Sequence, residues 1–279
     1  MANAHTPLYR PVGPDLAATQ ALLSHVLAGN EASVELRGVP ETDPVVGSVG
    51  QSARALNRYE VVERENVSPI VETAGTFDAW RKLTKPRWHS NIERLARKVG
   101  RQPNAEFSIV QVPTDLTGEL DVGFRVEASG WKGERRTAIQ SSPDTETFYR
   151  TVAESFHDRG QLRLSRIVLA EGCAAFDFCL LHGRRLYLLK TGFDERFRKL
   201  SPGLVLRLAT IERCFELGLE AHELLGNDAE WKRKFATNDR RHNNYRYYRR
   251  RPLPPARWLY RSAVRPRLKS VRQRIRRHA

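Results

Sequence analysis

The segment from Gly192 to Leu219 holds residues whose types and spacing suit a phosphate-bearing ligand. It has the pattern of a strand end, a polar turn and a helix that begins at Ser201-Pro202-Gly203. The first N–H groups of a helix are unpaired and carry partial positive charge, so they can hold a pyrophosphate where no side chain blocks the approach. Gly203 leaves that approach open. Three basic residues lie just upstream: Arg196, Arg198 and Lys199. The alternative is an ordinary helix cap, because serine caps and first-turn prolines are common.

A second segment places carboxylates ahead of an aromatic-lysine pair. Glu223 lies in a predicted short strand, and an acidic turn then leads to Trp231-Lys232. A carboxylate near a lysine could activate an acceptor amine or hydroxyl as a general base. The alternative is a solvated charged turn, which is common after strands.

The sequence offers little for metal or covalent chemistry. Cys173, Cys179 and Cys214 form no CxxC or Cys/His zinc pattern, and they predict buried thiols in a reducing compartment. The histidines have no metal-ligand spacing, and no GxSxG motif is present. We therefore expect neither a metal site nor a nucleophilic cysteine.

The charge is distributed unevenly over the 279 residues. The net charge is +15, but residues 231–279 contain 18 Lys or Arg and one acidic residue, so the rest of the chain is close to neutral. A near-neutral body does not favour a dedicated nucleic-acid-binding domain, while the basic tail could contact phosphates. Apolar stretches fall short of the roughly 20 residues that span a bilayer. We expect a cytoplasmic protein without a transmembrane segment.

Helical and strand patterns alternate in the first 112 residues. We expect helices over 15–28, 45–56, 76–83 and 85–99, and strands over 32–39, 58–65 and 107–112. The helix over 85–99 carries apolar residues at three- and four-residue spacing and five basic residues elsewhere.

The second half has a clearer pattern. Ser142-Pro143-Asp144 starts a helix that Gly160 ends, and three strands follow over 162–170, 173–182 and 185–191 as an antiparallel meander. The helix from Ser201 leads through Gly218 into a short strand over 221–225. These elements predict a mixed α/β (α+β) fold whose largely antiparallel sheet is flanked by helices.

The C-terminal residues have another pattern. Hydrophobic periodicity fades beyond Phe235 into an arginine-rich run over 240–251 that contains Tyr245, Tyr247 and Tyr248. We interpret this run as a linker or extended arm. Residues 257–277 are amphipathic, although Pro266 would interrupt a helix there.

Four short motifs follow one another between residues 127 and 235. They are Glu127-Ala128-Ser129-Gly130-Trp131-Lys132-Gly133 with Thr137-Ala138-Ile139; Glu171-Gly172-Cys173-Ala174-Ala175; Gly192-Phe193-Asp194 with Ser201-Pro202-Gly203; and Glu223 with Trp231-Lys232. In this order they resemble the acetyltransferase domain of CelD-type cellulose-biosynthesis proteins. The chain departs from this pattern at Arg136, Glu223, Asn227 and Trp231, and it matches the family's N-terminal half only in part.

The resemblance implies a GNAT-type fold related to the FemAB aminoacyltransferases, with a partial N-terminal GNAT-like half. It predicts boundaries at 7–125 for that half, 126–236 for the acyltransferase core and 237–279 for the basic tail. It implies that the donor, acetyl-CoA or another acyl-CoA, meets an amine or hydroxyl acceptor. The implied site residues fall into three groups. They are Arg198, Ser201, Pro202, Gly203 and Leu204 for the donor; Asp194, Glu223 and Lys232 for catalysis; and Trp131, Lys132 and Trp231 for the substrate.

Three functional hypotheses remain open at this point. The first is an acyl-CoA-dependent acyltransferase acting in envelope polysaccharide biosynthesis or on a small amine. The second is a FemAB-like transferase that uses aminoacyl-tRNA, with the tail gripping RNA through arginines and stacked tyrosines. The third is a non-catalytic GNAT-fold module whose tail docks on RNA, a partner or the inner, anionic face of the membrane.

Overall fold

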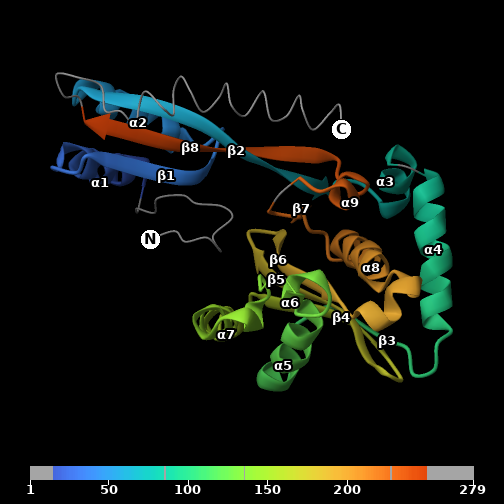
Figure 1. The fold of residues 1–279 in the computed structure, drawn as a ribbon. Coiled ribbons are helices and arrows are strands. Elements are labelled where there is room, and N and C mark those ends of the chain that lie inside the picture. The colour runs from blue at the N-terminus through green and yellow to red at the C-terminus, as the bar shows by residue number, and fades with distance from the viewer. Residues whose placement is uncertain (1–14, 85, 135, 227, 250–279) are drawn as a thin grey trace, which may run out of the picture. The chain divides into compact units, whose positions relative to one another are not determined.

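The computed structural model describes residues 15–84, 86–134, 136–226 and 228–249 (Figure 1). This part of the chain forms two compact units. Unit 1 contains the described residues up to Ser68 and from Arg240 on, and unit 2 runs from Pro69 to Asp239. The domain boundaries predicted from the motifs remain predictions.

Unit 1 is a three-stranded sheet with two helices. Its elements are α1 (Leu16–Ala28), β1 (Ser33–Pro40), α2 (Pro44–Ala55), and the parts of β2 (Arg58–Glu72) and β8 (Asn238–Arg249) that lie in this unit. The strand order is β1-β8-β2. Antiparallel pairing sets Val34 opposite Tyr247 and Leu36 opposite Tyr245. The helices pack their apolar side chains against this sheet, with Leu27 and Val49 buried.

The prediction of a linker from residue 240 is wrong for residues 240–249, which lie in β8. Tyr245, Tyr247 and Tyr248 are buried in this strand, and Arg246 among them pairs with Glu35 of β1. The strand mixes these tyrosines with polar and basic residues, so it shows no hydrophobic periodicity in the sequence. Residues 257–277 lie outside the described residues.

Unit 2 holds the larger sheet. In chain order its further elements are α3 (Phe77–Leu83), α4 (Pro86–Gly100), β3 (Glu106–Gln111), α5 (Leu116–Glu127), α6 (Trp131–Glu134), η1 (Ile139–Ser141), α7 (Pro143–His157), β4 (Leu162–Leu169), β5 (Gly172–His182), β6 (Arg185–Phe193), η2 (Glu195–Leu200), α8 (Pro202–Glu216), β7 (Ala221–Glu223) and α9 (Glu230–Arg233). From the end of β2 the order is β2-β7-β6-β5-β4-β3, antiparallel except for the parallel pair β6–β7.

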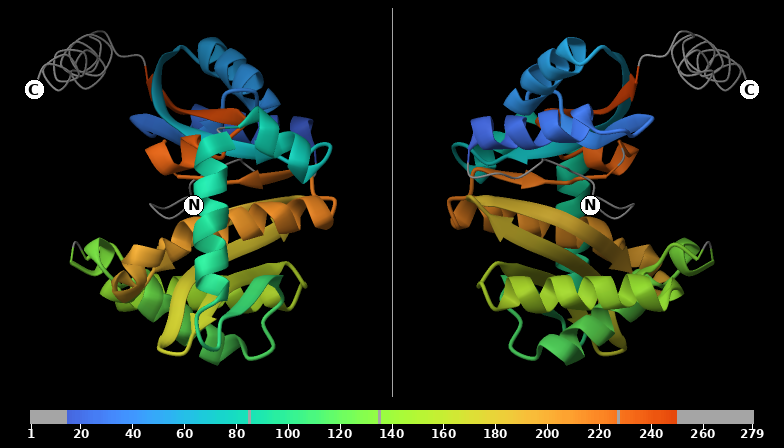
Figure 2. Two further views of the ribbon diagram at one scale, coloured as in Figure 1. Left: turned by 90° about the vertical axis from the view of Figure 1, so that its right-hand side faces the viewer. Right: turned by 90° about the vertical axis from the view of Figure 1, so that its left-hand side faces the viewer.

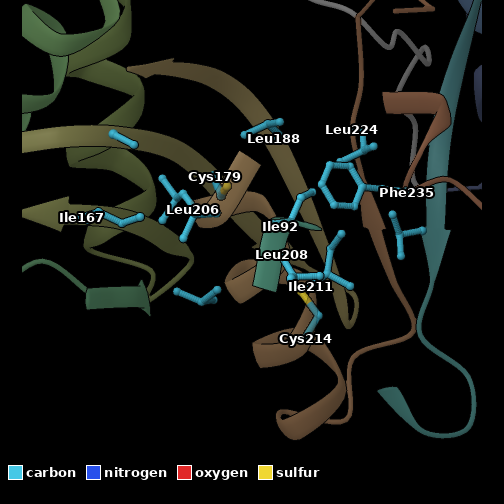
Figure 3. Close-up of a cluster of buried hydrophobic side chains, with 14 of the residues drawn as sticks. Ile92, Ile167, Cys179, Leu188, Leu206, Leu208, Ile211, Cys214, Leu224 and Phe235 are labelled. Atoms are coloured by element: carbon cyan, nitrogen blue, oxygen red, sulfur yellow. The ribbon is translucent and has the colours of Figure 1, made fainter. Parts of the chain in front are cut away.

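Two hydrophobic clusters cover the two faces of this sheet. One joins α4 and α8 to β4, β5 and β6, and includes Ile92, Leu188, Leu206 and Ile211 (Figure 3). The other joins α5 and α7 to β4 and β5 through Phe124, Phe176 and other apolar residues. The predicted fold class, a mixed α/β structure with a largely antiparallel sheet flanked by helices, is confirmed.

Most predicted elements lie where the sequence pattern placed them, including the meander of β4, β5 and β6 and the start of α8 at Pro202. The sequence analysis missed α5. Its N-cap Asp115 accepts from the Gly118 N–H (3.0 Å), and its apolar residues Leu120 and Phe124 are buried. None of the described helices is long and apolar enough to cross a membrane.

Candidate active site

The candidate site begins where β6 loses its neighbour. β6 pairs with β5 along its length, but with β7 only where Arg185–Tyr187 face Ala221–Glu223. From Leu188 to Phe193, β6 therefore has one edge without a ladder partner among the described strands. The chain then enters η2 and α8, so this edge and the start of α8 lie close in sequence and in space.

A cavity of about 600 Å³ lies at this place. It is bordered by the end of α5, the end of β6, η2, the first turn of α8 and the region of α9. The bordering residues are Glu127, Ser129, Thr191, Gly192, Phe193, Glu195, Arg198, Ser201, Gly203, Leu204, Ala229, Trp231 and Lys232. Six of the predicted site residues border this cavity. Arg198, Ser201, Gly203 and Leu204 come from η2 and the start of α8, and Trp231 and Lys232 come from α9, which is farther along the chain.

The first turn of α8 borders this cavity through Ser201, Gly203 and Leu204. Ser201 occupies the N-cap position with φ +47°, but its side chain makes no capping hydrogen bond, so it is not an ordinary serine cap. Pro202 has no N–H, and the N–H groups of Leu204 and Val205 donate to the Ser201 carbonyl (3.0 and 3.2 Å). No acceptor among the described residues receives the Gly203 N–H. This N–H, at the positive end of a 15-residue helix, suits an anion.

Gly203 has room for a small side chain. A Cβ built there would lie 3.5 Å from Cδ1 of Phe193, an ordinary contact. Gly192 is different, because a Cβ added there would lie 2.5 Å from the Glu127 Cα, which belongs to the backbone of α5. Gly192 therefore allows the end of α5 to pack directly against β6, which forms one wall of the cavity.

Lys232 is buried at the opposite wall. Its ammonium donates to the Leu225 carbonyl and lies 5.6 Å from the centre of the Trp231 ring. Leu225 and Gly226 both have positive φ, at +43° and +57°, and this turn brings the carbonyl to the lysine. A buried ammonium beside a cavity can stabilise negative charge that develops on a substrate oxygen.

The two predicted catalytic carboxylates do not border the cavity. Asp194 is the N-cap of η2, and its Oδ2 accepts from Arg196 Nη2 (2.7 Å); this hydrogen bond lowers the pKa of Asp194. Glu223 is fully buried in β7, where its Oε1 accepts from Arg185 Nη2 (2.6 Å) and Nε (2.9 Å). Both groups hold arginines.

Two other carboxylates border the cavity that the sequence analysis did not select. Glu127 ends α5, and its buried Oε2 accepts from the Ile139 N–H (2.9 Å) while Lys190 Nζ lies 3.9 Å from Oε1. Glu195 is exposed at the start of η2, and its N–H donates to Ser129 Oγ (3.2 Å). Glu127 is the first residue of the first motif, and this position could have marked it as a candidate site residue. Glu195 lies in none of the four motifs, so nothing in the sequence marked it.

A buried charged network lies behind the Trp231 wall. Arg207 of α8 pairs with Asp177 (2.8 Å) and donates to His222 Nε2 (2.7 Å), so His222 Nδ1 carries the proton that it donates to the Leu186 carbonyl (3.0 Å). Burial, with Arg207 beside it, lowers the pKa of His222 to about 3. The Arg207 guanidinium lies 5.8 Å from the centre of the Trp231 ring. The network thus ties α8, β5, β6 and β7 together under the site.

The cysteines do not border the cavity. All three are buried and none forms a disulfide, and burial raises the pKa of Cys173 to about 11 and that of Cys214 to about 12. A thiol with such a pKa is a poor nucleophile at neutral pH. The side chains of Trp131 and Lys132 lie outside the described ones. Pro202 is buried in the first turn of α8.

Comparison with solved structures finds the same fold in several proteins, among them the following three. The C-terminal domain of a protein described as a lysylphosphatidylglycerol synthetase, from Agrobacterium fabrum, has a TM-score of 0.59 at 11% identity, over 83% of this chain and 73% of that one. FemX has a TM-score of 0.56 at 13% identity, over 84% and 77%. A protein of unknown function from Bacteroides thetaiotaomicron has a TM-score of 0.55 at 12% identity, over 85% of this chain and 77% of that one. At such identities the likeness concerns the fold alone.

Sequence comparison is more specific. No curated protein matches the chain. The family model described as an acetyltransferase (GNAT) domain matches residues 86–233, just over half of the chain, which includes every residue that borders the cavity. The chain therefore belongs to the GNAT acetyltransferase domain family.

Proposed function

We propose that this chain is an acyltransferase that takes an acyl group from acetyl-CoA or another acyl-CoA and transfers it to an amine or hydroxyl. The observation that carries the proposal is the cavity at the start of α8, where the Gly203 N–H has no described acceptor and Arg198 adds a cation. Membership of the GNAT family supports acyl transfer in general.

The donor end of the proposed site is formed by Arg198, Ser201, Gly203 and Leu204, with Pro202 setting the first turn of α8. The Gly203 N–H and the Arg198 guanidinium suit phosphate, and Phe193 and Leu204 offer apolar surface to a pantetheine chain. The bound donor would supply a thioester. The nitrogen or oxygen of the acceptor bonds to the carbonyl carbon of this thioester and the C–S bond breaks. The proton that the acceptor loses ends on the sulfur, which leaves as the thiol.

The acceptor end is formed by Trp231 and Lys232, and the family resemblance also assigns Trp131 and Lys132 of the first motif to the substrate. In this proposal the Lys232 ammonium stabilises the thioester oxygen as it becomes negative. Asp194 and Glu223 act as positioning residues, because Asp194 fixes η2 and Glu223 fixes Arg185 beside β7. Direct attack on the thioester requires no covalent enzyme intermediate.

A narrower form of the proposal concerns the acceptor and the place of action. The four motifs resemble those of CelD-type proteins, and on that resemblance we propose an acceptor from envelope polysaccharide biosynthesis, used at the cytoplasmic face of the membrane.

A second candidate function is transfer from an RNA-linked donor. The tail no longer supports it through stacking, because Tyr245, Tyr247 and Tyr248 are buried in β8. A basic surface on α4, described below, does support it.

The proposal is tested by thermal unfolding with and without excess acetyl-CoA. A ligand at about 100 times its dissociation constant stabilises the folded protein by about 2.7 kcal/mol. We expect a clear upward shift of the melting temperature in the parent chain and none in Gly203→Glu, because the new side chain would fill the donor end and repel phosphate.

Gly47→Glu is the matched control. It adds the same charge to another helix, at an exposed position where a Cβ meets nothing within 4 Å. This variant should keep the full shift. No shift in the parent chain would overturn the acyl-CoA proposal, and a full shift in Gly203→Glu would place the donor elsewhere.

A further inference from the structure

The outer face of α4 carries five cations, which we call the basic stripe: Arg87, Arg94, Arg97, Lys98 and Arg101. All five are exposed. At 100° per residue their positions fall within an arc of about 100°. Arg101 follows the last helical residue, but its N–H still donates to the Arg97 carbonyl (3.2 Å), so the helical spacing of the basic stripe extends to Arg101.

The opposite face of α4 fixes this orientation. Ile92 and Val99 are fully buried and Leu95 nearly so, all in the cluster that α4 shares with α8. The left panel of Figure 2 shows α4 on the near side of unit 2, in front of α8 and the sheet. The helix cannot turn its apolar face outward without leaving the core.

Nothing among the described residues neutralises the stripe. None of the five cations pairs with a carboxylate there, and the one acid of the helix, Glu93, pairs with Arg81 of α3. Arg94 and Lys98 are four residues apart, as are Arg97 and Arg101, and like charges at this spacing destabilise a helix. A bound polyanion would remove that repulsion.

The stripe has the dimensions of a strand of phosphates. Its ends are 14 residues apart, which is about 21 Å along a helix. That length is too great for the phosphates of one nucleotide, and it suits several successive phosphates of a nucleic-acid strand. α4 also contacts η2, which carries the exposed Arg198 and Lys199, and Arg198 borders the cavity.

We propose that the basic stripe of α4 binds the phosphate backbone of an RNA strand. A membrane fits less well, because an interfacial helix inserts its apolar face between lipids and that face is buried here. The stripe offers phosphate contacts without base readout, so binding is independent of sequence and strongly dependent on salt.

The test measures binding of a fluorescent 20-nucleotide single-stranded RNA by the full chain at several salt concentrations, without acyl-CoA. Arg94→Glu with Lys98→Glu reverses the centre of the stripe. The control, Arg125→Glu with Arg159→Glu, makes the same change in net charge at exposed residues of unit 2 away from α4. Full-length chains are used throughout, so the basic residues after 249 contribute equally to each protein.

We expect the stripe variant to bind RNA at least tenfold more weakly than the control variant. Losing two phosphate contacts should lower the slope of log affinity against log salt by about 1.4. Arg94→Gln with Lys98→Gln should show a smaller loss in the same direction, and circular dichroism and the melting temperature verify that each variant is folded.

Equal RNA binding by the stripe and control variants would overturn the inference, as would absence of RNA binding by the parent chain. Stripe-dependent binding to phosphatidylglycerol vesicles, without RNA binding, would replace RNA by a membrane surface. The acetyl-CoA shift is measured separately in the same proteins, so a failure of the proposed function is distinguishable from a failure of this inference.

Discussion

At the scale of single residues, close backbone approach shapes the candidate site more than any catalytic group does. Gly192 has no side chain, and so the last turn of α5 lies directly on β6 and brings Glu127 and Ser129 to the cavity. The contact is steric, since the positive-φ glycines of the chain do not include Gly192. The shape of the site therefore depends on a residue that performs no chemistry.

Gly192→Ala should destabilise unit 2 by about 1–3 kcal/mol, because the new methyl group would meet backbone atoms of α5 that cannot rotate away. Urea unfolding followed by tryptophan fluorescence measures the loss. Gly203→Ala is the control, with an ordinary 3.5 Å contact and an expected change below about 0.5 kcal/mol. Equal stability of the two variants would contradict this account of Gly192.

At the scale of elements, helix ends are completed by side chains distant in sequence. The guanidinium of Arg58, at the start of β2, donates to three carbonyls around the end of α1: Leu27 (2.5 Å), Gly29 (2.9 Å) and Glu31 (3.2 Å). The last carbonyls of a helix have no partner within it. Arg58 is buried, so water has little access to these carbonyls in place of the guanidinium.

Arg58→Met should destabilise unit 1 by about 2–4 kcal/mol, because it leaves those carbonyls without a charged donor. Hydrogen exchange of the α1 amides should quicken more than exchange in unit 2. Arg37→Met, at an exposed arginine of β1, is the control and should change little. Unchanged exchange in α1 would show that the capping contributes nothing measurable.

At the scale of the whole molecule, two buried histidines make stability depend on pH. Burial lowers the pKa of His222 to about 3 and that of His89 to about 4, and nearby arginines act in the same direction. Both are neutral in the folded protein and take up protons near pH 6.5 when unfolded. The unfolded state then binds more protons, so stability is full above about pH 6.5 and falls as the pH drops.

The free energy of unfolding should change by about 1.4 kcal/mol per pH unit for each histidine between roughly pH 6 and pH 4. Below that range only His222 still contributes to the change. His222→Gln keeps a donor and an acceptor but does not titrate. Urea unfolding at several pH values should therefore give a curve that is flatter by about one proton. Parallel curves for the variant and the parent chain would contradict the assignment.

The sequence by itself determined the elements whose signals are local. The meander of β4, β5 and β6 and the start of α8 were predicted because turn residues and apolar periods lie within a few residues of each other. The same holds for the apolar and basic faces of α4. The fold class and the family resemblance followed from the order of these elements and their motifs.

Only the tertiary structure decided what depends on contacts between distant segments. It placed residues 240–249 in a strand, because their tyrosines gain a buried surface only when paired with β1. It showed that Asp194 and Glu223 do not border the cavity and that Glu223 binds Arg185, which is 38 residues away in the chain. It also brought Glu127 to the cavity through the close contact at Gly192. Such packing and pairing depend on three-dimensional distance, which a linear pattern does not encode.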